Sequence, residues 1–178
     1  PDATVATFSC LAQDFPQVLK VFAEILRTPA FAEEKLAIAR NETNTGISRR
    51  NDQPGGIVER EFAKLIYGAG SPYAAITEYA SVSSITREDL ASFHQRYFQP
   101  ERIVFGLAGD FEAKEMAAAL RAAFKDWPRG AGSKDPEALI QPSVKTGVYH
   151  VVKEDMTQSE IVMGHLGIRR DNPDYFAV

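Results

Sequence analysis

Histidines have the greatest capacity for metal binding or proton transfer in this chain, which contains three: His94, His150 and His165. None of them lies within zinc-finger spacing of another histidine or of Cys10. The sequence has neither His-Glu-x-x-His nor the inverted His-x-x-Glu-His, the spacings that place two imidazoles and a carboxylate on one helical face. The histidines therefore predict no zinc centre by themselves.

The other candidate groups also fall short of a site. His150 and Glu154 would share one face of a strand, but a catalytic zinc takes three protein ligands. His94 lies in a helical pattern, and we interpret it as a structural histidine. The segment "GLAGDF" lacks the Gly-Lys-Ser/Thr ending of a phosphate loop, and no Gly-x-Ser-x-Gly is present. We therefore predict no catalytic, cofactor-binding or metal-binding residue in this chain.

The bulk composition narrows the classes of protein. The chain has 178 residues, of which 44% are hydrophobic and 25% charged, and its net charge is -4. Lysines and arginines are dispersed, which excludes a basic stripe for nucleic acid and a polybasic membrane patch. No apolar run approaches the length of a membrane span. Cys10 is the only cysteine, so an internal disulfide is excluded. We predict that its side chain is buried. A single cysteine does not distinguish one cellular compartment from another.

Five segments carry apolar residues at the spacing of an amphipathic helix. Thr86 and Asp89 form a candidate capping box at the start of one of them, and Asp110 is predicted to cap the last. The predicted helices cover residues 15–26, 32–50, 57–68, 87–98 and 112–127.

The helix at residues 32–50 contains one unusual position. Gly46 interrupts it, and an internal glycine costs a helix roughly 1 kcal/mol relative to alanine. A glycine there would permit close packing by a neighbouring element, or it marks a side chain that is missing. The stripe predicted to face inward consists of Leu36, Ala39, Thr43, Gly46/Ile47 and Arg50.

Four segments rich in β-branched and aromatic residues are predicted strands: residues 3–11, 102–109, 144–152 and 159–168. The last two are joined by a short polar turn, which suits an antiparallel pair. Residues 69–85 are predicted to be a loop. Because strands and helices do not alternate regularly, the predicted fold class is α+β, an antiparallel sheet with helices packed on one face.

A segment rich in Gly, Pro, Ser and charges divides the chain at residues 129–143 and is predicted to be an inter-domain linker. Residues 1–128 are then the later half of a first α+β domain, and residues 144–178 begin a second, similar one. The chain starts at Pro1 without an initiator Met and stops just after a helix-start signal. We therefore expect an internal segment of a longer protein.

Several sequence motifs follow one another along the chain in a characteristic order. They are "ILRTPAFAEEKLAIARNETNTGISRRNDQP", "EFAKLIYGAGSPY", "ITREDLASFHQRYFQPERIVFGLAGDF", "ALRAAFKDWP" and, after the linker, "VYHVVKEDMTQSEIVMGHLGIRRDNPDYFAV". Each is weak alone, but in this order and spacing they resemble the pitrilysin/insulinase family of zinc peptidases, which includes the mitochondrial processing peptidases and their bacterial relatives. The resemblance covers nearly the whole chain.

The resemblance implies two similar α+β domains around a peptide-binding cavity. It also implies a zinc held by an inverted His-x-x-Glu-His, which would precede Pro1, and by a glutamate eight residues before Pro54. That position is Gly46, and the position of a supporting glutamate seven residues earlier is Ala39. Glu42 lies one turn from Gly46, but the fixed spacing to Pro54 argues against a shift of register.

The leading interpretation is therefore a family member without its own zinc site, which binds peptide and pairs with a zinc-bearing homologue. One alternative is an active zinc metalloendopeptidase whose ligands lie upstream of Pro1. Another is a structural scaffold subunit without a peptidase role.

The partners expected from this interpretation are a peptide or unfolded protein substrate and a homologous peptidase subunit, or a second copy through self-association. No cofactor is expected in this segment, although catalytic family members hold zinc. Bacterial relatives of this type are often exported, which suggests a periplasmic or exported protein.

Overall fold

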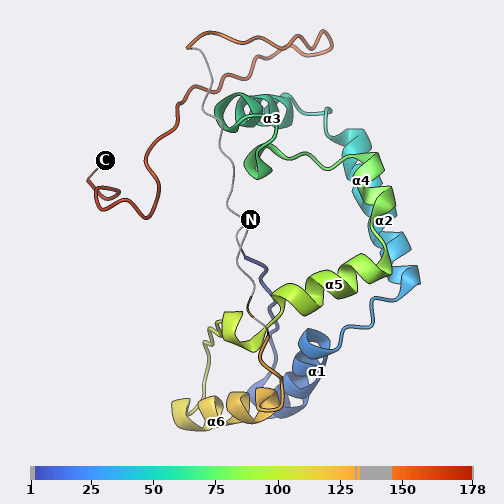
Figure 1. Ribbon diagram of the computed structural model, residues 1–178, viewed down its shortest axis with the longest axis vertical. Helices are drawn as coiled ribbons and strands as arrows, with labels where there is room; N and C mark the ends of the chain where they lie inside the picture. The colour runs from blue at the N-terminus through green and yellow to red at the C-terminus, as the bar shows by residue number, and fades with distance from the viewer. Residues whose placement is uncertain (1–2, 131, 133–145, 178) are drawn as a thin grey trace. The chain divides into compact units, whose positions relative to one another are not determined.

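The computed structural model describes residues 3–130, 132 and 146–177, and within them the regular elements are helices (Figure 1). The five predicted helices are confirmed, with ends shifted by a few residues. None of the described helices combines the length and apolarity that crossing a membrane requires. The elements in chain order are η1 (Ala12–Asp14), α1 (Phe15–Arg27), α2 (Glu33–Arg49), α3 (Pro54–Tyr67), η2 (Pro72–Ala74), α4 (Tyr79–Ser84), α5 (Arg87–Tyr97), η3 (Pro100–Arg102) and α6 (Ala113–Phe124).

The chain divides into two compact units, each made of two stretches of sequence. The first unit is Pro1–Ala37 with Ile85–Lys134, and the second is Ile38–Ser84 with Asp135–Val178. Helices α1, α5 and α6 belong to the first unit, α3 and α4 belong to the second, and the division falls inside α2. Most of the predicted linker lies outside the described residues, so the domain boundaries stay a prediction.

In the first unit, the amphipathic helix α1 packs against α6. Leu19 and Ala23, one helical turn apart, are each only 5% exposed and form the centre of this contact. The Phe8 ring lies 4.8 Å from the Phe22 ring, so residues before α1 pack along it. Burial of these side chains is what holds α1 in place, because helices this short are marginal alone.

In the second unit, α3 packs against the short helix η2. The Tyr67 and Tyr73 rings are 5.3 Å apart, and the buried Ser71 caps η2 by accepting a hydrogen bond from the Tyr73 backbone N–H at 3.3 Å. Gly68 ends α3 with φ 86°, as the sequence predicts. A Cβ at Gly164 would lie 3.0 Å from the Phe62 ring, so this glycine lets residues around 164 approach α3 closely.

The predicted antiparallel sheet is wrong, because the described residues contain no strand and no strand pairing. The backbone is extended at two positions in the predicted strands, with φ −69° and ψ 150° at Leu11 and φ −98° and ψ 131° at Ile103. Residues rich in β-branched side chains therefore favour an extended backbone locally, as expected. A strand also needs a partner that completes its hydrogen bonds, and local pattern cannot supply one.

Smaller predictions also need correction. Residues 69–85 contain η2 and α4 rather than a continuous loop, and α3 begins at Pro54, because proline is well tolerated in the first helical turn. The residue before α6 is Glu112, so Asp110 does not cap that helix. Cys10 is exposed rather than buried.

The capping box that begins α5 is confirmed. The Asp89 backbone N–H donates to Thr86 Oγ1 at 3.1 Å, and the Thr86 backbone N–H donates to Asp89 Oδ2 at 2.8 Å. This backbone hydrogen bond, together with one from the Thr86 hydroxyl, holds the pKa of Asp89 below its usual value. Two of the helix's unpaired backbone donors are thereby satisfied.

We expect Thr86→Ala to lower the free energy of unfolding by about 1 kcal/mol, because the cap is lost, whereas Thr86→Ser retains it. A carboxyl whose pKa is lowered on folding stabilises the fold above its unfolded value of about 3.9, and this stabilisation disappears as pH falls through the lower folded value. The difference between wild type and Thr86→Ala should therefore shrink in acid. Urea denaturation followed by circular dichroism measures both effects, and equal losses for the Ala and Ser variants would contradict the capping role.

Candidate functional site

The face of α2 that carries Ala39 and Gly46 is exposed. The buried residues of this helix are Leu36 and Ile47, and the half-buried Arg40 and Asn44 lie between them along the same side. The predicted inward stripe is therefore rotated by about one residue, since Ala39, Thr43 and Gly46 all face outward. The positions at which the family resemblance expects carboxylates thus form an open surface of small side chains.

Gly46 is not required for close packing. A Cβ built on its backbone meets no other atom within 4 Å. The explanation that a neighbouring element needs this space is therefore wrong for the described residues. The helix carries the cost of glycine there without a contact that compensates it.

The residues around Gly46 do not fit a zinc ion. Glu42 supplies one exposed carboxylate a turn away, whereas a catalytic zinc takes three protein ligands. Across the part of the chain that the structure describes, no group of three or more His, Cys, Asp or Glu side chains is arranged to hold a metal. No chemistry that depends on zinc can be derived from these residues.

His94 is held by structural contacts, which agrees with its interpretation from sequence as a structural histidine. Its Nε2 lies 2.8 Å from the Leu26 carbonyl oxygen, to which it donates, and its ring stacks on Phe98 at 4.8 Å. His165 is exposed, with Nδ1 near the Leu166 carbonyl, and His150 is exposed. Since residues 150–154 form no strand, the predicted shared face of His150 and Glu154 is not formed.

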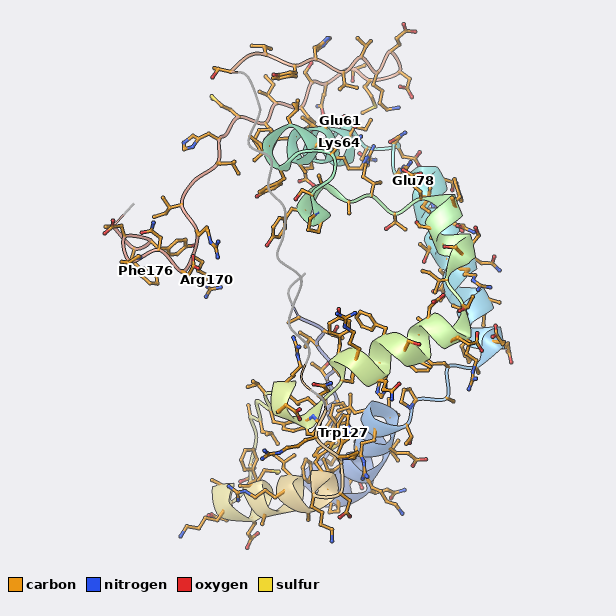
Figure 2. The ribbon with its side chains drawn as sticks, viewed as in Figure 1. Glu61, Lys64, Glu78, Trp127, Arg170 and Phe176 are labelled. Atoms are coloured by element: carbon orange, nitrogen blue, oxygen red, sulfur yellow. The ribbon has the colours of Figure 1, made fainter. Side chains whose placement is uncertain are left out.

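Two arginines hold the "NDQP" turn that follows α2. Arg50 donates to the Thr77 carbonyl at 2.9 Å and to both carboxylate oxygens of Glu78 at 3.1 Å (Figure 2 labels Glu78). Arg60 donates to the carbonyls of Arg50 at 3.1 Å and Gly56 at 2.9 Å. Side-chain hydrogen bonds of Arg50 and Arg60 therefore hold the turn that lies between Gly46 and the start of α3.

Sequence analysis missed these arginine contacts, although one signal was available. Arg50 falls on the stripe predicted to face inward, and a charged side chain there needs a partner. The pattern does not say which residue that partner is. Glu78 lies 28 residues along the chain, beyond the range of helical spacing rules.

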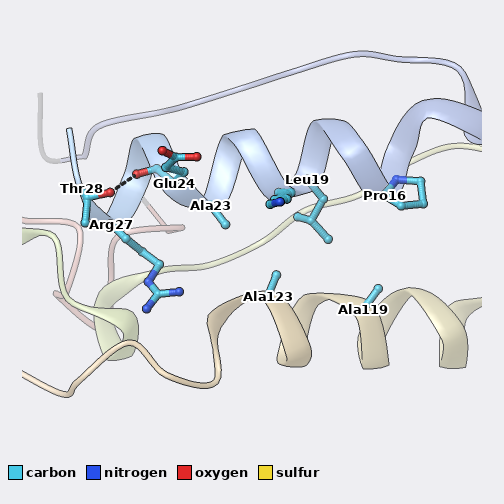
Figure 3. A pocket seen from close by; sticks show the side chains of 9 residues that line it. Pro16, Leu19, Ala23, Glu24, Arg27, Thr28, Ala119 and Ala123 are labelled. Carbon is cyan, nitrogen blue, oxygen red and sulfur yellow. Dashed lines mark hydrogen bonds between the residues drawn. The ribbon is translucent and has the colours of Figure 1, made fainter. Parts of the chain in front are cut away.

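A groove lies along the seam between α1 and α6 in the first unit (Figure 3). Its volume is about 470 Å³. Its floor is apolar, and two of its polar side chains donate to backbone carbonyls, Thr28 Oγ1 to Glu24 at 3.1 Å and Arg27 Nη2 to Asp126 at 3.3 Å. Its lining residues include no nucleophile paired with a base. The lining residues are Pro16, Leu19, Lys20, Ala23, Glu24, Arg27, Thr28, Ala119 and Ala123.

Large apolar side chains stand in solvent along the extended segments. Val104 is 95% exposed, Ile161 85% and Met163 94%, and Phe176 is also almost fully exposed (Figure 2). Apolar surface of this kind marks sites of association in soluble proteins. These side chains are therefore candidates for contact with another molecule.

We expect Gly46→Ala to raise the free energy of unfolding by about 0.5–1 kcal/mol, because alanine favours the helix and finds open space. Gly164→Ala is the matched control, since its Cβ would press on Phe62 and should destabilise the chain. Chemical denaturation of both variants measures the difference. A destabilised Gly46→Ala variant would mean that an element does pack against Gly46.

Comparisons with known proteins agree on one family. The family model described as the peptidase M16 inactive domain matches residues 84–178, which is more than half of the chain. An uncharacterized zinc protease of Streptomyces coelicolor is 23% identical over 94% of this chain and 38% of its own length. An uncharacterized zinc protease of Mycobacterium leprae is 27% identical over 86% of this chain and 35% of its own length.

A solved structure is also similar. It is a peptidase M16 inactive domain from Pseudomonas fluorescens, which is 28% identical with a TM-score of 0.73. The match covers 94% of this chain and 40% of that one. The chain thus spans well under half the length of the relatives that it matches.

Proposed function

The chain belongs to the peptidase M16 inactive-domain family, and we propose that it acts in proteolysis as a non-catalytic half, which binds peptide and pairs with a zinc-bearing homologue. Membership of a peptidase family rests on the family match and on the zinc-protease relatives. The non-catalytic role and the pairing with a homologue go beyond these matches and are the content of the proposal.

One observation carries the proposal: the exposed pair Ala39 and Gly46 on α2. Residues seven apart lie on the same face of a helix, so two carboxylates at these positions would point in one direction. Neither position has a side chain that binds a metal, and the space beside Gly46 is open. The loss of both carboxylates without a packing benefit is what a discarded zinc site would leave.

The exposed apolar side chains support the pairing. Val104 lies in one segment outside the helices and Ile161 and Met163 lie in another, and each side chain would gain free energy by leaving water. Aliphatic side chains contribute about 1.5–3 kcal/mol each when fully buried, so covering a few of them supplies much of the free energy of a stable interface. A homologous subunit or a second copy of the chain is the partner we infer.

A second candidate function is an active zinc endopeptidase whose ligands lie outside these residues. The observation that favours it is the name of the relatives, which are called zinc proteases. Under this candidate Gly46 would not correspond to a ligand position at all.

We expect the purified chain to bind no stoichiometric zinc, because a lone carboxylate such as Glu42 holds zinc weakly. Gly46→Glu should leave the zinc content unchanged, since one added carboxylate still leaves the ligand set incomplete. Metal analysis by mass spectrometry after gel filtration measures this, with a chelator-treated sample as the baseline. One tightly bound zinc per chain would overturn the non-catalytic role.

The peptide-binding role has its own test. A fluorescently labelled, extended peptide should bind the chain without being cut, and cleavage should begin only when a zinc-bearing homologue is added. Fluorescence anisotropy reports binding, and mass spectrometry of the peptide reports cleavage. Cleavage by the chain alone would favour the endopeptidase, and an absence of binding would remove the peptide role.

A further inference from the structure

The connector between α1 and α2, residues 28–32, contains the only residue other than glycine with positive φ among the described residues. This residue is Phe31, with φ 43°. The left-handed region is unfavourable for side chains with a Cβ, and a bulky aromatic residue there is a genuine outlier. Such a conformation persists only where the surroundings hold it.

The surroundings that hold Phe31 come from α5. Arg87 Nε donates to the Phe31 carbonyl at 3.1 Å, and Arg87 Nη2 donates to the Ala30 carbonyl at 3.2 Å. The Arg87 guanidinium thus binds the carbonyl that precedes the strained Phe31 Cα and the carbonyl that follows it. The planar fork of arginine fits two neighbouring acceptors in a way that lysine does not.

His94, two turns further along α5, holds the other end of the connector. Its ring meets the Phe31 ring edge-on at 5.9 Å, and its Nε2 donates to the carbonyl of Leu26 in the last turn of α1. Arg87 and His94 are seven residues apart and therefore lie on one face of α5. The face of one helix thus contacts both ends of the connector.

The strained residue also lies directly before α2. The backbone N–H groups of Lys35 and Leu36 donate to the Ala32 carbonyl at 2.9 and 3.0 Å, so helical hydrogen bonding begins at the residue after Phe31. The backbone angles of Phe31 therefore determine the direction in which α2 starts. A return of Phe31 to ordinary negative φ would redirect the first turn of α2.

We propose that the α1–α2 connector is a strained hinge, which Arg87 and His94 hold in its left-handed conformation. When the hydrogen bonds of Arg87 and the ring contact of His94 are broken, Phe31 relaxes to negative φ and the first turn of α2 moves. The hinge is a conformational device of the first unit and does not depend on the proposed role in peptide binding.

Hydrogen exchange of the backbone amides of residues 30–36 in the full chain tests the hinge, because it reports local opening. Arg87→Ala should speed this exchange by at least about tenfold, since the loss of even one hydrogen bond from a charged donor corresponds to about that factor. Arg87→Lys should give a smaller increase, and Arg121→Ala, which removes an exposed arginine of α6, should give none. Unchanged exchange in both Arg87 variants would overturn the role of Arg87.

The strain itself is tested by comparing Phe31→Gly with Phe31→Ala, each combined with Arg87→Lys. Both substitutions remove the ring, but only glycine adopts positive φ without strain. At an ordinary site the glycine variant would open faster than the alanine variant. At a strained hinge it should open more slowly, by about threefold. Equal or faster opening of the glycine variant would overturn the proposal.

Discussion

Arginine side chains that donate to backbone carbonyls hold together the connections of this structure. Arg87 binds two carbonyls of the α1–α2 connector, Arg60 binds the two ends of the α2–α3 turn, and Arg50 reaches the segment before α4. Carbonyls outside helices need donors, and these segments have no neighbouring strand to provide them. The guanidinium group, with five donors in a rigid fork, satisfies several acceptors at once.

This constraint also explains why the turn after α2 keeps its geometry although its sequence is rich in residues that break helices. Pro54, Gly55 and Gly56 enter the first turn of α3 instead of forming a loop. Proline is well tolerated there, and Arg60 links this first turn to the residue that follows α2 by donating to the carbonyls of Gly56 and Arg50. The geometry of the turn between α2 and α3 is therefore held by side-chain hydrogen bonds.

The helices could be predicted from sequence because their signals are local. Apolar spacing located α1 to α3, α5 and α6, and the Thr86 capping box marked the start of α5. The antiparallel sheet could not be predicted reliably, since β-branched residues favour an extended backbone but pairing depends on a distant partner. The side of α2 that faces inward was assigned one residue out of register, because Ala39 and Thr43 are too small to distinguish the two sides. The strain at Phe31 left no signal, since aromatic residues rarely adopt positive φ.

The candidate site differs from an ordinary exposed helix face in what it lacks. An exposed helix face usually carries several charged side chains, yet Ala39, Thr43 and Gly46 are small and uncharged, and Glu42 is a charged residue next to them on this face of α2. Gly46 weakens the helix and makes no contact that offsets its cost, so neither helix stability nor packing explains it. The role proposed above would supply an explanation, since either a partner lying against this face or the loss of a metal ligand from it would account for a glycine at this position. Under the proposed pairing, the exposed face of α2 and the large apolar side chains outside the helices, such as Val104 and Met163, would both lie against the partner.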